Sequence, residues 1–287
     1  MTNEFNDDVA LEVPPNEEPS DVGPEPEGGV RVTLIDYILY VPFVLCWCGT
    51  LLIFDVLQRV AIIFGPKWHE KSVILLNDTL VLLLRIVRVG VRVRYEAPLK
   101  RTVPCLVLAN HQSLYDIPIL YSVFRGMHPK FVAKKELAHW IPSVSFNLRH
   151  GGAAIVDRSN PRQAIPELGS FAERMISDGF TGILFPEGTR ARKGVMREFL
   201  PAGVAAMLRK IESIKVIPVT IEGSWRLFPY RYGPIPRGTL IRVTVHKPIL
   251  WSKGMDAQAL VKAAEQCIRD RQAIDSKRHE KGLVSNL

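Results

Sequence analysis

A histidine followed five residues later by an aspartate is the part of this sequence best suited to acid–base chemistry. His111 and Asp116 lie in the segment NHQSLYD (110–116), directly after an apolar run at 104–109 that predicts a buried strand. An imidazole that a carboxylate holds in one tautomer can take a proton from a hydroxyl group. The same segment contains Ser113-x-x-Asp116, a capping-box pattern that begins a helix without any chemistry. Taken alone, the segment leaves both interpretations open.

Further segments downstream also pair a strand-like run with a turn or a charged end. GAAIVDR (152–158), GILFPEGTR (182–190) and VIPVTIEG (216–223) follow NHQSLYD in that order, and FVAKKEL (131–137) lies between the first two blocks. In order and spacing these blocks resemble the 1-acylglycerol-3-phosphate acyltransferase family over roughly residues 100–250. The resemblance implies a glycerolipid acyltransferase fold, an α/β fold with a mixed sheet flanked by helices. It also implies transfer of a fatty acyl group from a thioester to lysophosphatidic acid, which makes phosphatidic acid.

The resemblance, together with the residue chemistry, assigns expected roles. His111 is expected to act as the general base on the acceptor hydroxyl, and Asp116 to orient the ring and stabilise the imidazolium. The acyl thioester is already reactive, so no enzyme nucleophile is needed; acyl-CoA or acyl-carrier protein is the co-substrate, and no metal or organic cofactor is implied. We expect the acceptor to be held by the family's EGTR block and one more arginine: Glu187, Gly188, Thr189, Arg190 and Arg158.

Structural alternatives remain for these residues. Glu187 and Arg190 could form a local ion pair at a turn, and Arg158 could pair with Asp157 or Glu187. Two more residues have even weaker assignments. Lys134 is either a contact for charge near the reaction centre or an exposed lysine, and Pro218 either shapes the acyl side of the pocket or lies in a core strand.

One departure from the family pattern concerns the acceptor. Many relatives carry a Phe-Lys-x-Gly-like segment after the EGTR block, whereas this chain has EFLPAG at 198–203. The lysine is missing, which leaves glycerol 3-phosphate, another lysophospholipid or a lyso-aminolipid open as acceptors. A non-catalytic membrane-surface binding protein is a further hypothesis, although the intact histidine–aspartate pair argues against it.

The N-terminal 30 residues differ from the rest of the chain in charge. They carry nine carboxylates and no Lys or Arg, so of the 29 carboxylates in the chain 20 remain against 37 Lys and Arg, a formal charge of +17 for residues 31–287. The segment is rich in proline and poor in apolar residues, which predicts an acidic disordered tail. The basic body favours an anionic partner, but without aromatic residues interleaved among basic runs nucleic acid is excluded.

Two apolar stretches follow the tail. Residues 37–54 contain no charge, and residues 72–91 are interrupted by Asn77-Asp78, Arg85 and Arg88. We expect a pair of helices that embeds one side in a phospholipid leaflet, with these arginines near headgroups; a true span and a pair that merely covers the core are the alternatives. If the first stretch spans the membrane, Arg59 and Lys67 after it predict a catalytic domain on the cytoplasmic side. The four scattered cysteines have no metal-ligand spacing.

The expected organisation is therefore an acidic tail at 1–30, membrane-associating helices at 31–92 and an acyltransferase domain at 93–287. Within the domain, short β-rich runs alternate with helical spacing, which indicates an α/β fold. Helices are expected around 165–176 and 260–268. The expected strands are Val91–Tyr95, Cys105–Ala109, Lys130–Ala133, Ala153–Val156, Thr181–Phe185, Val216–Ile221 and Leu240–His246.

Overall fold

The computed structural model describes residues 32–99, 104–228 and 233–280. The acidic tail expected at 1–30 lies outside these residues. One eight-stranded sheet runs through the described part of the chain, with the order β1-β7-β6-β2-β5-β3-β4 and with β8 paired to β6. The strands are β1 (Gly90–Tyr95), β2 (Cys105–Ala109), β3 (Pro129–Lys134), β4 (Ala154–Val156), β5 (Thr181–Leu184), β6 (Ser213–Glu222), β7 (Leu240–Val245) and β8 (Ile249–Ser252).

Strand direction divides this sheet into two parts. β6, β2, β5, β3 and β4 run parallel to one another. β7 and β8 run antiparallel to β6, and β1 pairs parallel with β7. The carboxyl ends of five strands therefore meet at one edge of the sheet, which is where open α/β sheets place their ligands.

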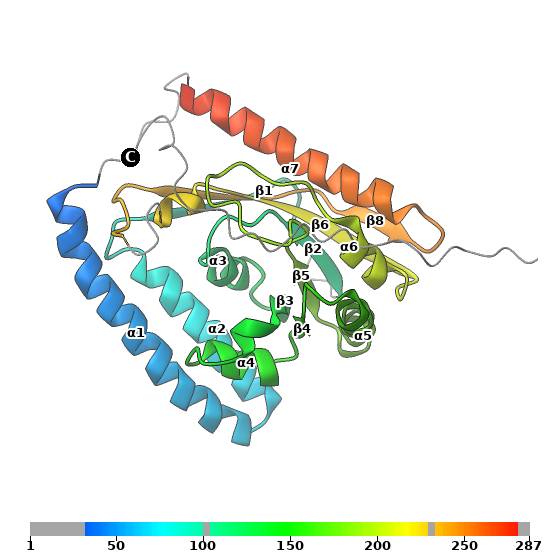
Figure 1. Ribbon diagram of the computed structural model, residues 1–287, viewed down its shortest axis with the longest axis horizontal. Coiled ribbons are helices and arrows are strands. Elements are labelled where there is room, and N and C mark those ends of the chain that lie inside the picture. Colours follow the sequence, from blue (N-terminus) through cyan, green and yellow to red (C-terminus); the bar gives the residue numbers. More distant parts are fainter. Residues whose placement is uncertain (1–31, 100–103, 229–232, 281–287) are drawn as a thin grey trace, which may run out of the picture.

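Helices cover both faces of the sheet (Figure 1). Helices α1 to α4 lie on one face and α5 to α7 on the other. In the sequence, β4, the last strand at one end of the sheet, separates the two groups. Their bounds are α1 (Leu34–Ile63), α2 (Pro66–Leu83), α3 (Asp116–Val123), α4 (Val144–His150), α5 (Pro161–Asp178), α6 (Pro201–Leu208) and α7 (Ala257–Glu280). Two short 3-10 turns, η1 (Lys135–Ala138) and η2 (Ser224–Leu227), follow β3 and β6.

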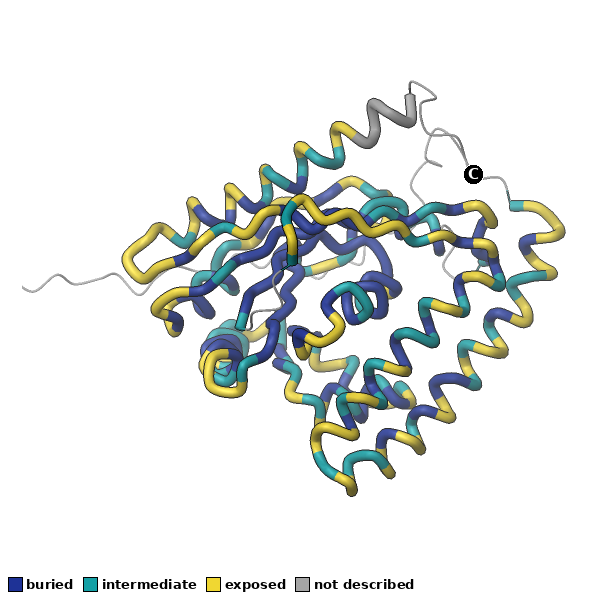
Figure 2. The backbone as a smooth tube through the Cα atoms, turned by 180° about the vertical axis from the view of Figure 1, so that it is seen from behind, coloured by how far each residue is buried: buried dark blue, intermediate teal, exposed yellow. Residues whose placement is uncertain are grey.

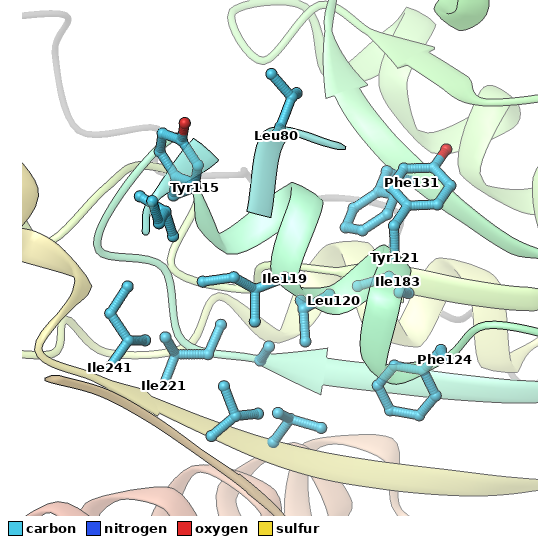
Figure 3. Close-up of a cluster of buried hydrophobic side chains, with 14 of the residues drawn as sticks. Leu80, Tyr115, Ile119, Leu120, Tyr121, Phe124, Phe131, Ile183, Ile221 and Ile241 are labelled. Atoms are coloured by element: carbon cyan, nitrogen blue, oxygen red, sulfur yellow. The ribbon is translucent and has the colours of Figure 1, made fainter. Parts of the chain in front are cut away.

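Alternation along the central strand β2 separates two hydrophobic cores. Cys105, Val107 and Ala109 point into the core on the α1–α3 side, whereas Leu106 and Leu108 point into the core on the α5–α7 side. All five β2 residues are fully buried. Figure 3 shows the first core, in which Ile119, Leu120 and Phe124 of α3 lie over the sheet. Buried on both faces, β2 holds the segment that follows it in a fixed position.

The helix α1 lies along the domain and is attached to it at both ends. Its buried side includes Phe43, Leu51 and Phe54. Near its start the Asp36 carboxylate accepts the Arg237 N–H at 3.0 Å, and near its end the Gln58 side chain donates to Ser143 Oγ at 2.7 Å. These polar contacts fix α1 against the rest of the molecule.

The outer side of α1 is apolar and exposed. Ile38, Leu45 and Leu52, at intervals of seven residues, are 61%, 68% and 60% exposed. This helix, Leu34–Ile63, is long and apolar enough to cross a membrane: an 18-residue stretch within it has a mean hydropathy of 2.1, and only 17% of that stretch is buried. Figure 2 shows the exposed positions recurring along its length. A soluble surface helix would carry polar side chains there.

The expected elements are largely confirmed. All seven expected strands are present within a few residues, as are the two expected helices, α5 and α7. The helix expected over the second apolar stretch, residues 72–91, was wrong at its C-terminal end, because α2 stops at Leu83. Arg85 and Arg88 lie in the turns that follow α2, and Val91 belongs to β1. The expected domain boundary at residue 93 falls inside β1, which pairs with β7 along its full length.

Candidate active site

His111 and Asp116 come together at the carboxyl end of β2. Ring nitrogen Nδ1 of His111 lies 2.8 Å from Asp116 Oδ2, and the Asp116 side chain is fully buried. A carboxylate can only accept, so Nδ1 carries the proton and Nε2 presents a lone pair. The side chain of His111 is 11% exposed. The pair therefore has the geometry of a general base with its orienting acid.

The Asp116 carboxylate also shapes the turn between the strand and α3. Oδ2 accepts the N–H groups of Gln112 at 2.6 Å and Ser113 at 2.8 Å. Ser113 Oγ accepts the Tyr115 N–H at a long 3.4 Å, so the hydroxyl is a weak cap. Of the two hydrogen bonds of a capping box, the one from the Ser113 N–H to the Asp116 carboxylate is present. It coexists with the bond between Asp116 and His111. Oδ1 of Asp116 is buried and has no hydrogen-bond partner among the described residues.

Two residues that the sequence did not single out fix the histidine. The Phe185 ring, just after β5, stacks on the imidazole with centroids 4.0 Å apart and planes 14° apart. The Asn110 side chain donates to the Ile221 carbonyl at 2.8 Å and accepts the Ile221 N–H at 2.7 Å, which ties the end of β2 to β6. Phe185 lies in the FPEGTR block and Asn110 precedes the histidine, but neither position has a sequence signal for these contacts.

Glu187 is a brace between two loops. Its Oε1 accepts the backbone N–H of His111 at 2.7 Å, and its Oε2 accepts that of Arg197 at 2.8 Å. The side chain is buried, and burial raises its pKa to about 7 although both N–H bonds oppose that shift. The ion pair considered between Glu187 and Arg190 is absent from the described residues. This carboxylate positions the catalytic loop from behind, so the expectation that it binds the acceptor does not follow from its contacts.

Arg190 follows β5, the neighbour of β2, and lies near the histidine–aspartate pair. Its side chain is half-buried and makes no hydrogen bond or ion pair with any described residue. Burial lowers the pKa of the guanidinium, Arg192 lowers it further, and Asp116 opposes the shift, so Arg190 lies within electrostatic range of that carboxylate. Gly188, with φ of +70°, turns the chain between Glu187 and Arg190, and Thr189 is exposed. An unpaired, partly desolvated guanidinium favours an anionic ligand.

Arg158 and Lys134 lie farther along the same edge. Arg158 follows β4, has no hydrogen bond or ion pair among the described residues, and has a pKa lowered by burial. The considered Asp157 partner is bonded to Lys135, which holds the Asp157 pKa at about 2, and Lys134 pairs with Glu136 at 3.4 Å. β4 is three strands from β2, about 14 Å at the usual strand spacing. Arg158 is therefore free to bind an anion, but at a greater distance from His111 than Arg190.

Pro218 is a buried residue of the central strand β6. It is aligned with Leu108 of β2, and its carbonyl accepts the His246 N–H at 3.0 Å. On its other side β6 pairs with β8 up to Val216 and with β7 from Val219, so position 218 lies where the partner strand changes. A residue without an N–H fits that gap. These contacts support the alternative that Pro218 lies in a core strand and does not shape the acyl side of the pocket.

Two hollows of the described surface do not include the histidine. One hollow, of about 350 Å³, is lined by Glu198 and Lys262 among others. The other, of about 290 Å³, is lined by Tyr95 and Arg125 among others. Neither is lined by His111 or Arg190. Above the histidine, Gln112 contacts Ser224 Oγ and the Gly194 carbonyl, both at 3.4 Å. On the α1 side, the Tyr115 ring lies 6.3 Å from that of Phe43. The catalytic loop thus packs directly against the apolar helix. Among the described residues no group of three or more His, Cys, Asp or Glu could hold a metal ion.

Comparison with known proteins finds partial similarity to acyltransferases. Residues 90–222 match the Acyltransferase family. A chloroplast 1-acyl-sn-glycerol-3-phosphate acyltransferase of Brassica napus is 31% identical over 150 residues, 52% of this chain and 42% of that protein. The lyso-ornithine lipid O-acyltransferase of Rhizobium meliloti is 33% identical over 122 residues, 42% of this chain and 36% of that protein. The chain spans less than half the length of these curated relatives.

A solved structure gives the same fold. The crystal structure of the 1-acyl-sn-glycerophosphate acyltransferase of Thermotoga maritima is similar with a TM-score of 0.61 and 24% identity, over 85% of this chain and 95% of that one. The expected mixed sheet flanked by helices is confirmed by this likeness. Over residues 90–222 the chain is therefore similar in sequence to the Acyltransferase family, and its fold is that of the Thermotoga maritima structure.

Proposed function

We propose that this protein transfers a fatty acyl group from an acyl thioester to the free hydroxyl of lysophosphatidic acid and makes phosphatidic acid. The observation that carries the proposal is the His111–Asp116 pair, 2.8 Å apart, with the Arg190 guanidinium nearby, which makes no hydrogen bond or ion pair with any described residue. An alcohol with a nearby phosphate needs both a base and a cation. Relatives named as 1-acyl-sn-glycerol-3-phosphate acyltransferases support this choice of substrate.

The reaction follows from the positions of the side chains. The acceptor hydroxyl gives its proton to His111 Nε2 as its oxygen attacks the thioester carbonyl carbon. The carbon–sulfur bond then breaks, and the leaving thiolate takes the proton from the imidazolium to become a free thiol. Asp116 stabilises the imidazolium while it exists. Arg190 holds the acceptor phosphate, with Lys134 and Arg158 next along the edge. The donor is acyl-CoA or acyl-carrier protein.

We further propose that the protein lies on a phospholipid membrane rather than across it. The outer side of α1 is apolar, but the helix is bonded to the domain near both ends, through Asp36 and Gln58. A helix held in this way can bury its outer side in one leaflet. On the opposite, buried side of α1, Phe43 lies near Tyr115 of the His111 loop, so this helix separates the loop from the leaflet. If α1 instead spans the membrane, Arg59 and Lys67 near its C-terminal end favour a catalytic domain on the cytoplasmic side.

The membrane contact can be tested by vesicle flotation. Replacing Leu45 and Leu52 by lysine should release the protein from phospholipid vesicles, because it places two charges on the proposed lipid-facing side. A lysine at Ile176, which is 41% exposed on α5, is the matched control and should leave binding unchanged. If the α1 double variant floats as well as the unaltered chain, α1 does not contact the membrane.

A second acceptor deserves a test because of one relative. The lyso-ornithine lipid O-acyltransferase of Rhizobium meliloti is 33% identical to this chain over 122 residues. We therefore propose lyso-aminolipid as the alternative acceptor, followed by glycerol 3-phosphate and other lysophospholipids. The chemistry at His111 is the same for all of them.

One assay separates these hypotheses. Free-thiol release from an acyl thioester is measured with vesicles that contain a single acceptor at a time. We expect lysophosphatidic acid to give the largest rate. A larger rate with a lyso-aminolipid would replace the proposed acceptor, and vesicle binding without thiol release for any acceptor would support a non-catalytic surface protein.

A further inference from the structure

Four arginines lie between the end of α2 and the end of β1, a segment that we call the arginine strip: Arg85, Arg88, Arg92 and Arg94. All four are exposed, and none makes a hydrogen bond or ion pair with a residue in the described part of the chain. By contrast, Arg59, Arg125 and Arg269 each have a carboxylate partner. Glu96, which is bonded to His246 near Arg94, offsets only part of this charge, so the four cations create a positive potential that favours an anionic occupant.

Part of the strip faces away from the apolar side of α1. Side chains alternate along β1, and Val91 packs against the core on the α1–α3 side, so Arg92 and Arg94 project on the α7 side. Arg88 lies between Val87 and Val89, which are both buried in that same core. A bilayer that contacts the outer side of α1 therefore does not cover Arg92 and Arg94. An occupant of these two positions must come from elsewhere.

The chain itself supplies an anionic segment at this place. In the first turn of α1, Asp36 accepts the N–H of Arg237 at 3.0 Å. The next residues of that loop bond to the start of the strip, because Gly238 donates to the Arg88 carbonyl at 3.0 Å and Gly90 donates to Thr239 at 2.9 Å. Figure 1 shows the first turn of α1 at the same end of the molecule as the C-terminal end of α7. Whatever precedes α1 in the sequence thus begins beside the arginines.

We propose that residues 1–30 dock on the arginine strip. They carry nine carboxylates and no Lys or Arg. Thirty residues can reach up to about 100 Å, whereas the strand from Arg88 to Arg94 is only about 20 Å long. The tether gives the segment an effective concentration on the order of millimolar, so even weak ion pairs hold it in place. The docked segment screens part of a body with a charge of +17 and keeps other anions off the strip.

Zero-length coupling in the full chain tests the contact. Arg92→Lys keeps the positive charge and provides an amine, which a carbodiimide joins to any carboxylate in contact with it. Peptide mapping should find residue 92 coupled to residues 1–30 in low salt, about 0.02 M, and the coupling should disappear at about 0.5 M because the screening length shrinks. Arg209→Lys is the matched control, since Arg209 is exposed on the cap of α6 and has no partner among the described residues.

The outcomes are distinct. The docking is supported if position 92 couples at least about tenfold more than position 209 and if high salt abolishes this coupling. Tenfold is roughly the advantage that a local tether gives. Equal coupling at the two positions, or coupling that ignores salt, overturns it. Neither result depends on acyl transfer.

A second measurement asks whether headgroups occupy the strip instead. In the full chain, the nine carboxylates are replaced by their amides, and binding to vesicles with and without anionic phospholipid is compared. Uncovering the strip should raise binding to the anionic vesicles by about tenfold or more, and adding Arg92→Glu with Arg94→Glu should cancel the gain. Unchanged binding after the amide replacement would mean that the segment does not cover the strip, which also overturns the proposal.

Discussion

The carboxylates and the arginines at the active-site edge differ in how their charges are balanced. Asp116 accepts hydrogen bonds from His111 and from two backbone N–H groups, and Glu187 accepts two backbone N–H groups from separate loops. Arg158 and Arg190 have no such partner among the described residues. The negative groups are thus part of the scaffold, whereas the guanidinium groups are left for a ligand. The variants below test this division.

The largest effect is expected for Asp116→Asn. The amide cannot hold the Nδ1 proton of His111 in the same way, and the backbone N–H groups of Gln112 and Ser113 compete for its oxygen. We expect kcat to fall by about 10²–10⁴-fold, measured as thiol release. Asp78→Asn is the control, because Asp78 is bonded to Ser122 and Arg125 away from the site. An Asp116→Asn enzyme with full activity would show that Asp116 serves only the turn.

The second largest effect is expected for Glu187→Gln, which should lower both the free energy of unfolding and kcat. The amide oxygen can accept one of the two N–H groups, and the NH₂ group then faces the other. Leaving one buried donor unsatisfied costs about 1–3 kcal/mol in the free energy of unfolding. Because the loop of His111 loosens, kcat should fall while the acceptor KM stays nearly constant. A rise in acceptor KM alone would mean that Glu187 binds the acceptor after all.

The pH dependence of stability gives an independent check on Glu187. Burial raises its folded-state pKa to about 7 from the ordinary 4.5, so the folded protein holds this proton more tightly than the unfolded chain does. The stabilisation is fully present below pH 4.5 and is lost as the pH rises towards 7. Urea unfolding should therefore show the difference between the unaltered chain and Glu187→Gln shrinking over this window. A difference that grows with pH would contradict the assignment.

Arg190→Ala should act on binding rather than on chemistry. Losing a charge-assisted contact to a phosphate raises the acceptor KM by about 10–100-fold, while the KM for the thioester changes little. Arg209→Ala, which removes an exposed arginine on α6, is the control for charge alone. A larger change in the thioester KM than in the acceptor KM would reassign Arg190 to the donor.

The smallest effect is expected for Arg158→Ala. Its strand lies about 14 Å from β2, beyond the screening length of about 10 Å at ordinary salt. We expect the acceptor KM to rise by less than about tenfold. An effect as large as that of Arg190→Ala would show that the acceptor phosphate extends along the edge to β4.

Local patterns explain what could be predicted from the sequence. His111 and Asp116 are separated by one turn, so their contact follows from the segment itself, and the apolar run before them fixes β2. The strands could be recognised for the same reason. The outcome for the apolar stretches was mixed: α1 continues through Pro42 to Ile63, and α2 ends earlier than expected.

Long-range contacts to the backbone explain what was missed. The N–H group that Glu187 accepts from His111 is 76 residues away in the sequence, and a backbone N–H leaves no trace in residue identity. From the sequence, Glu187 is therefore expected to bind the acceptor or to pair with Arg190, its neighbour in the EGTR block. Asn110 and Ile221, which are 111 residues apart, could not be paired for the same reason. The function of Pro218 in the core likewise depends on β8, a strand that the sequence did not predict.

The most direct test of the account is thiol release by His111→Ala with lysophosphatidic acid as acceptor. Removal of the base should lower kcat by about 10²–10⁴-fold, while circular dichroism and the unfolding midpoint stay close to those of the unaltered chain. A folded His111→Ala protein that releases thiol at the normal rate would contradict the claim that this imidazole activates the acceptor.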